Sequence, residues 1–290
     1  MINITILLPT RKRVTTLKKS IESLINTAKY PERLQFLFAI DEDDPDTINF
    51  LKSSHYPNQT VITFKPMGYE NIHKYNNTLA LYSQGKWLMF FNDDALMTTY
   101  NWDSKIMDRG SNFRVLRVRE QTGHPYAIFP IFLRDWFVLL DHISLHGQND
   151  AWISEIAYML DIMRNIDIDI IHDRADITGN NNDETFKARK YNEGNPEDPN
   201  DLHSEKMLNL RYRDAYKIAW YLEKIGQRSN AWDLVLSKKR DPFIKLKELF
   251  NIYNQKGAIG KGLQDVRTDS KTQTKRSDHT LSENERSTCA

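Results

Sequence analysis

The sequence predicts an α/β fold in which a mostly parallel sheet is flanked by helices and followed by a helical C-terminal extension. Two observations carry this prediction. Short apolar runs, typical of strands buried on both faces, alternate with segments of helical periodicity through the first half of the chain. Glycine, proline and acidic residues bound these runs, as is typical of strands that end in loops. The length of 290 residues allows one large domain or two.

Four apolar runs are the expected strands of this sheet. They occupy residues 2–8, 34–40, 61–64 and 87–91. A first helix begins after Thr15 or Thr16 and ends before Pro31, a short second helix begins near Thr47, and a third lies within residues 69–82. Because strands and helices alternate, we expect parallel strands joined by right-handed crossovers.

The run at 87–91 organises the chain because it stops on Asn92, Asp93 and Asp94. In open α/β sheets, ligands bind just beyond the carboxyl ends of the strands. Two carboxylates and an amide at such an edge cost desolvation free energy unless a cation or hydrogen-bond donors meet them. A divalent metal that carries a phosphate-bearing substrate would meet them, since hard cations take oxygen ligands. The alternative is a solvated turn after the strand.

A second acidic segment follows the strand at 34–40. Five carboxylates lie within residues 41–46 and would repel one another if all of them entered one ordered site. We therefore expect one or two of them to face a ligand. The others are expected to be solvated or to cap the short helix that begins near Thr47.

Composition and missing motifs exclude several classes of function. Lysine and arginine number 40 against 39 acidic residues, so bulk charge gives no indication of nucleic-acid binding. No Gly-x-Gly-x-x-Gly or Gly-Lys-Ser/Thr loop follows a strand, which disfavours a dinucleotide fold or a P-loop. The phosphates of a bound nucleotide would then be bound by a metal ion that carboxylates hold.

The expected cellular setting is the cytoplasm. The single Cys289 cannot form a disulfide framework, and the N-terminus lacks the features of a signal peptide. The most apolar long window, residues 127–143, is too short and too charged to span a bilayer.

These motifs together resemble the nucleotide-binding half of a GT-A glycosyltransferase. They are a first strand ending in Leu-Pro-Thr-Arg, a second ending at Asp41, a helix with Asn76 and Asn77, and an apolar strand leading into Asn92-Asp93-Asp94. The chain is most similar to the large inverting family two, over roughly the first 180 residues. The resemblance rests on order and spacing, since each motif alone is weak.

The resemblance implies a nucleotide-sugar donor and a metal ion. The loop after the first strand and the acid after the second would hold the base and ribose, here Pro9, Thr10, Arg11 and Asp41. A UDP-sugar is the favoured donor, and Mn²⁺ or Mg²⁺ the metal.

The Asp-any-Asp motif of the family falls on residues 92–94. Its first acid is replaced by Asn92, which lowers the charge near the metal, while Asp94 inherits the role of direct metal ligand. Asp93 would lie near the ribose or a metal-bound water, and Asn76 would contribute to nucleotide binding.

Two further candidates lie in the second half of the chain. By resemblance, Asp150 would be the general base that deprotonates the acceptor hydroxyl, a task that suits a carboxylate. Its structural alternative is a capping role, with Asn149 or Asp150 capping a helix over residues 151–164. Residues 166–171 alternate isoleucine with polar residues and predict a strand. His172 follows it and is a candidate for completing the metal or diphosphate site.

The remaining segments carry fewer predictions. Residues 114–120 alternate apolar residues with arginines, and we favour a solvated basic face over an edge strand. A helix is expected over residues 202–225 and another over 242–253. Four basic residues beside the first of these helices are expected to form its solvated face or, alternatively, to contact an anionic partner or membrane surface. They are Arg211, Arg213, Lys217 and Lys224.

The expected domain organisation has three parts. A glycosyltransferase domain covers 1–185, a linker or lid with the helical extension covers 186–256, and a disordered tail covers 257–290, which is almost free of apolar residues. The predicted reaction moves a sugar from a nucleotide-diphosphate sugar to a hydroxyl of a glycan or other acceptor, with inversion. The alternatives are a sugar-phosphate nucleotidyltransferase on the same fold and a non-catalytic sugar- or partner-binding protein.

Overall fold

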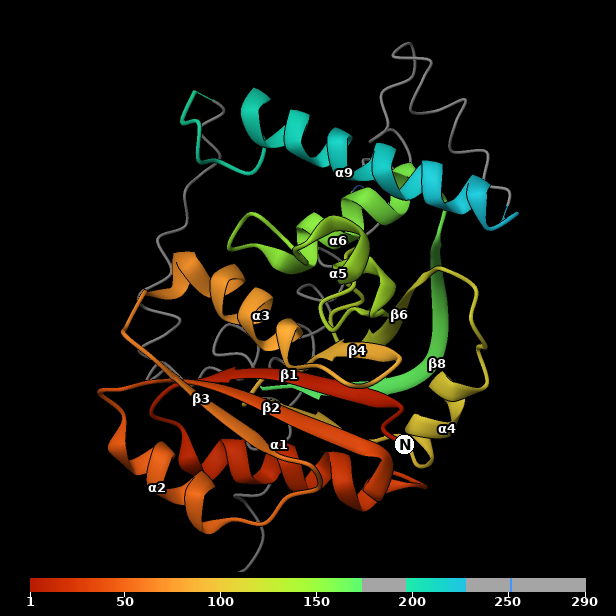
Figure 1. The fold of residues 1–290 in the computed structure, drawn as a ribbon. Coiled ribbons are helices and arrows are strands. Elements are labelled where there is room, and N and C mark those ends of the chain that lie inside the picture. The colour runs from red at the N-terminus through yellow and green to blue at the C-terminus, as the bar shows by residue number, and fades with distance from the viewer. Residues whose placement is uncertain (174–196, 228–250, 252–290) are drawn as a thin grey trace, which may run out of the picture.

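The computed structural model describes residues 1–173, 197–227 and 251, and it contains an eight-stranded mixed sheet flanked by helices (Figure 1). The strand order is β3-β2-β1-β4-β7-β6-β8-β5. The strands are β1 Ile4–Thr10, β2 Leu34–Asp41, β3 Thr60–Phe64, β4 Trp87–Phe90, β5 Ala95–Met97, β6 Val115–Glu120, β7 Ile131–Leu133 and β8 Met163–His172. The predicted α/β class is confirmed.

The first half of the sheet is parallel, as the alternation of strands and helices predicts. β1 lies between β2 and β4, and β2 pairs in parallel with β3. The residues of β2 and β4 are all buried, which explains why these strands have continuous apolar runs in the sequence. Gly85 precedes β4 because a side chain there would collide with the backbone of β1; an added Cβ would lie 2.5 Å from Thr5 N.

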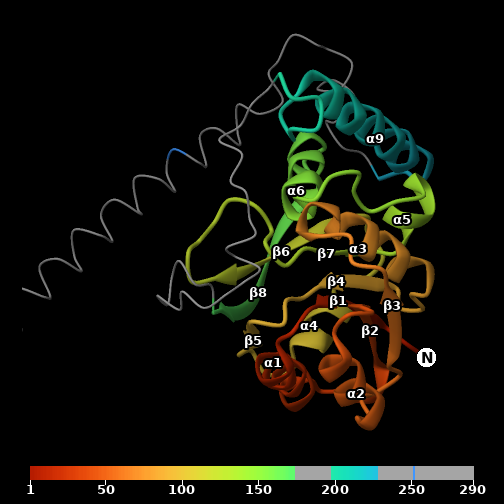
Figure 2. The same ribbon diagram turned by 90° about the vertical axis from the view of Figure 1, so that its left-hand side faces the viewer.

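Helices cover both faces of the sheet. α1 Val14–Thr27 and α2 Pro45–Ser53 lie on one face, and α3 Ile72–Leu81 lies on the other (Figures 1 and 2). α1 buries Leu17, Ile21 and Leu24, which recur at helical spacing. The carboxylate of Asp44 accepts a hydrogen bond from Thr47 N at 3.2 Å and caps α2, which confirms that part of the acidic segment has a capping role.

The second half of the sheet is mixed. β7 runs antiparallel to β4 and β6, β6 is parallel to β8, and β5 is antiparallel to β8. Residues 115–120 form an interior strand, β6, between β7 and β8 and not an edge strand, and the side chain of Arg119 on it is exposed to solvent. Arg117 and Arg119 on β6 bind Asn165 and Asp169 on β8 at 3.0 and 2.7 Å. Pairing with a distant strand therefore satisfies the polar side chains of β6.

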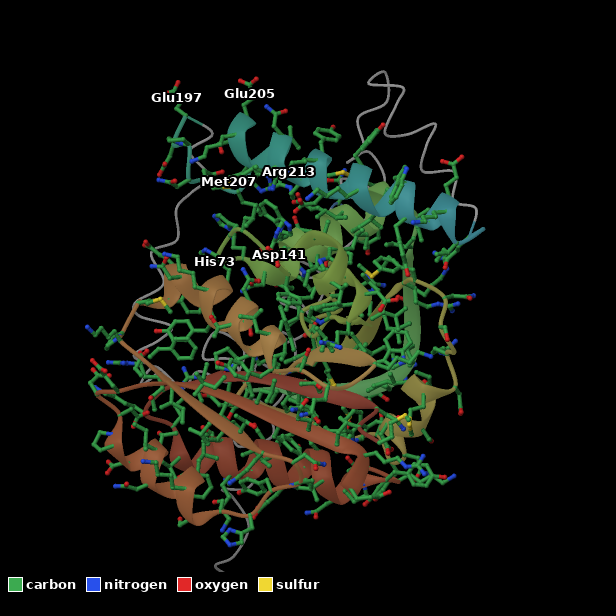
Figure 3. All side chains as sticks on the ribbon, viewed as in Figure 1. His73, Asp141, Glu197, Glu205, Met207 and Arg213 are labelled. Atoms are coloured by element: carbon green, nitrogen blue, oxygen red, sulfur yellow. The ribbon has the colours of Figure 1, made fainter. Side chains whose placement is uncertain are left out.

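Two helices of the second half pack against the last described helix, and a third lies against the sheet. α5 Asp135–Leu140 and α6 Asn149–Met159 contact α9 Glu205–Lys224, whereas α4 Trp102–Met107 contacts β8. α9 lies across α5 and α6, and Met207 is one of the α9 side chains on its buried side (Figure 3). The prediction that Arg211 lies on a solvated helix face was wrong: its side chain is fully buried, whereas Arg213 is exposed.

Several sequence predictions fall outside the described residues. These are the helix over 242–253 except residue 251, the tail from 257, and residues 186–196 of the predicted linker or lid. In the part of the chain that the structure describes, no helix combines the length and the apolarity needed to cross a bilayer.

Candidate functional site

The candidate site lies where the carboxyl ends of β1, β2 and β4 meet. Because these strands are parallel neighbours, Thr10, Asp41 and the loop at 92–94 follow strands that end at the same edge. β5 is antiparallel to β8, which pairs Ala95 with His172 and brings the end of β8 to the same loop. The sheet topology therefore gathers most of the predicted site residues.

The first cluster surrounds Asp41 at the end of β2. Arg11 forms an ion pair with Asp41 and a bidentate pair with Asp43, in which both distances are 2.6 Å. The Tyr75 hydroxyl donates a hydrogen bond to Asp41 and accepts one from Met67 N at 2.9 Å. Burial, with the hydrogen bond to Asp41, raises the pKa of Tyr75 to about 12, so the phenol stays protonated. The hydrogen bond from Arg11 lowers the pKa of Asp43.

The second cluster is the acid pair that follows β4. Thr10 Oγ1 donates a hydrogen bond of 2.7 Å to Asp93 Oδ2. Arg13 Nη1 lies 2.9 Å from Asp93 Oδ1 and 3.2 Å from Asp94 Oδ2, so one guanidinium bridges both carboxylates. Burial raises the pKa of Asp93 to about 6. Burial also opposes ionisation of Asp94, but His172 and Arg13 more than offset it and lower the Asp94 pKa.

His172 faces the free side of this acid pair. Its Nε2 lies 3.1 Å from Asp94 Oδ1 and 3.1 Å from Asn92 Nδ2. Gln121 holds the backbone of His172 from both sides: its amide oxygen accepts from His172 N at 2.9 Å and its amide nitrogen donates to His172 O. The ring packs edge-on against Phe129, with centroids 5.0 Å apart. The imidazole is therefore fixed toward Asp94.

The pair of Asp94 and His172 fits a divalent metal. Asp94 Oδ1 is fully buried and has no aligned hydrogen-bond partner, a costly arrangement unless a cation meets the oxygen. Two neighbouring ligands of an octahedral ion with bonds of about 2.1 Å are about 3.0 Å apart, and Asp94 Oδ1 and His172 Nε2 are 3.1 Å apart. The described residues contain no group of three or more His, Cys, Asp or Glu side chains that could hold a metal. Further ligands would come from other atoms.

The other residues predicted to bind the nucleotide are Pro9, Thr10 and Asn76, on β1 and α3. Pro9 and Thr10 are the last two residues of β1. Asn76 is buried on α3, directly after Tyr75, and its Oδ1 has no hydrogen-bond partner. The neighbouring Asn77 instead binds the loop before α6, where its Oδ1 accepts from Ile143 N at 2.8 Å. Asn76 therefore keeps a buried acceptor available for a ligand.

Asp150 lies in the first turn of α6 and has no capping role. The N-cap of α6 is Gln148, and no side chain caps the helix, so the capping prediction was wrong for both Asn149 and Asp150. The predicted helix over 151–164 also ends earlier, because β8 begins at Met163. No hydrogen bond or ion pair joins Asp150 to another described residue. Burial and the neighbouring Glu155 are the main causes of the raised pKa of Tyr126, and the charge of Asp150 adds to them, so Asp150 and Tyr126 interact electrostatically.

A buried ion pair joins α6 to α9. Arg211 Nε on α9 lies 2.7 Å from Glu155 Oε2 on α6, and both side chains are almost completely buried. Tyr126 donates a hydrogen bond of 2.8 Å to the other oxygen of Glu155. The Arg211 guanidinium also lies over the Trp152 ring, 5.5 Å from its centroid. Nothing in the local sequence pattern indicated this pair, whose members are 56 positions apart.

Comparisons with known proteins give structural likeness only. No protein-family model and no curated protein sequence matches the chain. S. aureus TarS 1–349 in complex with UDP is 13% identical with a TM-score of 0.46; the match covers 60% of this chain and 59% of that one. A longer S. aureus TarS structure is 11% identical with a TM-score of 0.48, covering 78% of this chain and 43% of that one. This chain therefore spans little more than half, or less, of the TarS chains it matches.

The mannosyltransferase PcManGT from Pyrobaculum calidifontis, in complex with GDP-Man and Mn²⁺, is a third neighbour. It is 12% identical with a TM-score of 0.49, and the match covers 89% of this chain and 86% of that chain. All three TM-scores are below 0.5, so these likenesses carry no argument about this chain. The chemistry has to be argued from the residues of this chain.

Proposed function

We propose that the protein is a metal-dependent glycosyltransferase that uses a nucleoside-diphosphate sugar as donor and a hydroxyl as acceptor. The observation that carries the proposal is the arrangement at one sheet edge. There, the Asp41 cluster lies beside an acid pair whose buried Asp94 Oδ1 faces His172 Nε2 at 3.1 Å. The first cluster offers hydrogen-bonding groups for a nucleoside, and the second offers oxygen and nitrogen ligands for a metal.

Nucleotide binding is assigned to the residues around β1, β2 and α3. Asp41 would accept hydrogen bonds from the base or ribose, and its position is supported by Arg11 and Tyr75. Pro9 and Thr10 line the end of β1, Asn76 offers its unpartnered amide oxygen, and Asp93 lies near the ribose. Buried acceptors of this kind recognise hydroxyl and imide groups of a ligand because such groups are hydrogen-bond donors. A UDP-sugar is the proposed donor.

Mn²⁺ or Mg²⁺ would be held by Asp94 and His172. When bound, the ion supplies charge neutralisation for the diphosphate leaving group. Arg13 neutralises the far oxygen of Asp94 and one oxygen of Asp93, which keeps the two acids together at the edge of the sheet. His172 presents Nε2 because Gln121 and Phe129 fix its backbone and ring.

Asp150 is proposed as the general base. Its carboxylate has no partner among the described residues, so it is available to accept a proton. The acceptor oxygen would attack the anomeric carbon while the bond from that carbon to the diphosphate oxygen breaks. The hydroxyl proton would pass to Asp150. A single displacement of this kind inverts the configuration at the anomeric carbon.

The metal and nucleotide sites are tested with Asp94→Ala. Calorimetry should show that UDP binds the parent protein more tightly with Mn²⁺ than without it, and that the variant loses this difference although its urea unfolding remains a single cooperative transition. Asp46→Ala removes an exposed carboxylate from α2 and serves as the matched control. Equal Mn²⁺-dependent affinity in the Asp94 variant would remove the metal site from the proposal.

Activity separates this proposal from its rivals. A glycosyltransferase releases a nucleoside diphosphate from UDP-, GDP- or dTDP-sugars in the presence of Mn²⁺. A nucleotidyltransferase instead releases inorganic diphosphate from a nucleoside triphosphate and a sugar phosphate. A binding protein is stabilised thermally by a nucleotide sugar but turns over neither substrate.

A further inference from the structure

One face of α9 exposes aromatic and basic side chains together. Tyr216 and Trp220 lie one helical turn apart and are 48% and 51% exposed. Lys217 and Lys224 are exposed on the same half of the helix, and the Lys224 ammonium lies 5.1 Å from the centroid of the Trp220 ring. Ile225, directly after α9, is 45% exposed. Large apolar groups are therefore left at the surface among cations.

This face points away from the body of the molecule. α9 is the outermost described helix on the side opposite α1 and α2 (Figures 1 and 2). Its other side packs on α5 and α6, where Ala215, Ile218 and Leu222 are buried. A large partner could therefore reach the exposed face without displacing any strand of the sheet.

Three arginines extend the positive charge beyond the end of α9. Gln227, just after α9, exchanges two hydrogen bonds of 2.7 Å with the backbone of Phe113. Arg114 is the next residue after Phe113. Partial burial, followed by the positive charges of Arg164 and Arg109, lowers the pKa of Arg114. The three guanidinium groups therefore repel one another, and an anionic partner would relieve this repulsion.

The charges of this surface do not cancel. The exposed basic side chains of α9 outnumber its exposed acidic ones; they are Lys206, Arg213, Lys217 and Lys224 against Glu205 and Glu223. In the arginine cluster, Asp161 lies 3.7 Å from Arg164 and offsets part of the charge. The whole chain has 40 basic and 39 acidic residues, so the excess is local. A local positive excess of this kind attracts an anionic partner.

We propose that the exposed face of α9 and the neighbouring arginine cluster dock the protein on a bilayer surface rich in acidic phospholipids. The cations bind the lipid headgroups, while the Trp220 and Tyr216 rings enter the headgroup region, where amphipathic aromatic rings are favoured. A soluble polyanion would satisfy the cations, whereas a bilayer also takes up the apolar side chain of Ile225. The surface shares no residue with the candidate site, so docking is independent of the proposed activity.

Vesicle sedimentation with the full chain tests the proposal. The parent should bind phosphatidylcholine vesicles that contain phosphatidylserine more tightly than vesicles of phosphatidylcholine alone, and added salt should weaken this binding by screening the charges. Replacing both Lys217 and Lys224 by glutamine should weaken binding roughly 25-fold, since each cation near an acidic bilayer contributes roughly five-fold. Trp220→Ala should weaken binding roughly five-fold and keep the salt dependence, because the half-buried ring contributes apolar area and no charge.

Two matched controls change side chains of the same kinds outside α9. Lys52→Gln on α2 and Tyr100→Ala before α4 remove an exposed cation and an exposed aromatic ring, and both variants should bind vesicles like the parent. Urea unfolding checks that every variant is folded. Release of nucleoside diphosphate from a nucleotide sugar, measured without vesicles, should be the same in the α9 variants and in the parent.

Three results would overturn the proposal. The first is a parent protein that does not bind the vesicles, whether or not it binds a soluble polyanion such as a single-stranded oligonucleotide. The second is equal binding to vesicles with and without phosphatidylserine. The third is a double lysine variant that binds as tightly as the parent. Each of these results would leave the proposed glycosyltransferase function standing, because that function is measured without a bilayer.

Discussion

Replacing Arg211 by methionine should destabilise the protein strongly, because Glu155 would be left buried without its cation. The two groups lie 2.7 Å apart, and both are almost completely shielded from solvent. Arg211 also donates a hydrogen bond of 2.5 Å from Nη1 to the Leu202 carbonyl at the start of the α9 segment. Methionine keeps much of the side-chain volume and removes the charge and both polar contacts.

The expected loss is about 3–5 kcal/mol at neutral pH, the usual cost of removing one partner of a buried ion pair. For a domain of this size, such a loss lowers Tm by roughly 6–20 °C. Replacing both partners, as Arg211→Met with Glu155→Leu, removes the unpaired charge. The double variant should therefore recover most of the loss, since well-packed apolar residues often replace a buried pair at little cost. Arg213→Met, on the exposed side of α9, should change stability by less than about 0.5 kcal/mol.

The pH dependence gives an independent check. Burial raises the pKa of Glu155, and the charge of Arg211 opposes this effect. Without Arg211 the Glu155 pKa rises further, so the folded variant binds a proton more tightly than the unfolded chain. The stability difference between variant and parent should therefore shrink as the pH falls below the raised pKa of Glu155 and grow as the pH rises through it.

Urea unfolding of the four proteins between pH 5 and pH 8 measures all of these effects. The reasoning would be refuted by a single variant within 1 kcal/mol of the parent, or by a double variant no more stable than Arg211→Met.

The remaining predictions concern the candidate site directly. Asp150→Asn should keep the stability and donor binding of the parent, because Asp150 does not cap α6. Turnover on the true acceptor should fall by a factor of ~10²–10⁴, the usual effect of losing a positioned base. A normal transfer rate would reject this role. Tyr75→Phe removes the donor to Asp41 and the acceptor for Met67 N, so stability should fall by about 1–3 kcal/mol in urea unfolding and UDP binding should weaken. Unchanged UDP affinity would separate Tyr75 from the nucleotide site.

The parallel half of the fold could be predicted because its strands are buried on both faces. Such strands have continuous apolar runs, which are visible locally. β5 was not predicted as a separate strand because it has three residues, too few for a periodic signal. β6 was misread because Arg117 and Arg119 have their partners on β8, about fifty positions away. Local polarity cannot reveal pairing with a distant strand.

The acids of the candidate site could be placed for a related reason. Asp41, Asp93 and Asp94 follow strand signals, and parallel strands bring their ends to one edge. Their partners carried no comparable signal. Tyr75 lies within the third predicted helix and Arg13 in the loop after the first predicted strand, and neither position indicates the carboxylate that the side chain binds. The partner of a side chain depends on tertiary packing. The sequence does not show whether a given tyrosine or arginine is solvated or buried against a carboxylate.

The two acids of the pair after β4 differ in their surroundings, which bears on the roles proposed for them. Asp93 is held from two sides, by Thr10 on one oxygen and Arg13 on the other, and burial raises its pKa to about 6. Asp94 shares Arg13 on one oxygen only and keeps the other directed toward His172. Because a carboxylate bonded at both oxygens has little capacity left for a cation, Asp93 is suited to a neutral hydroxyl such as ribose. Asp94 keeps its other oxygen beside the imidazole nitrogen of His172, so it is the member of the pair that we propose as the metal ligand.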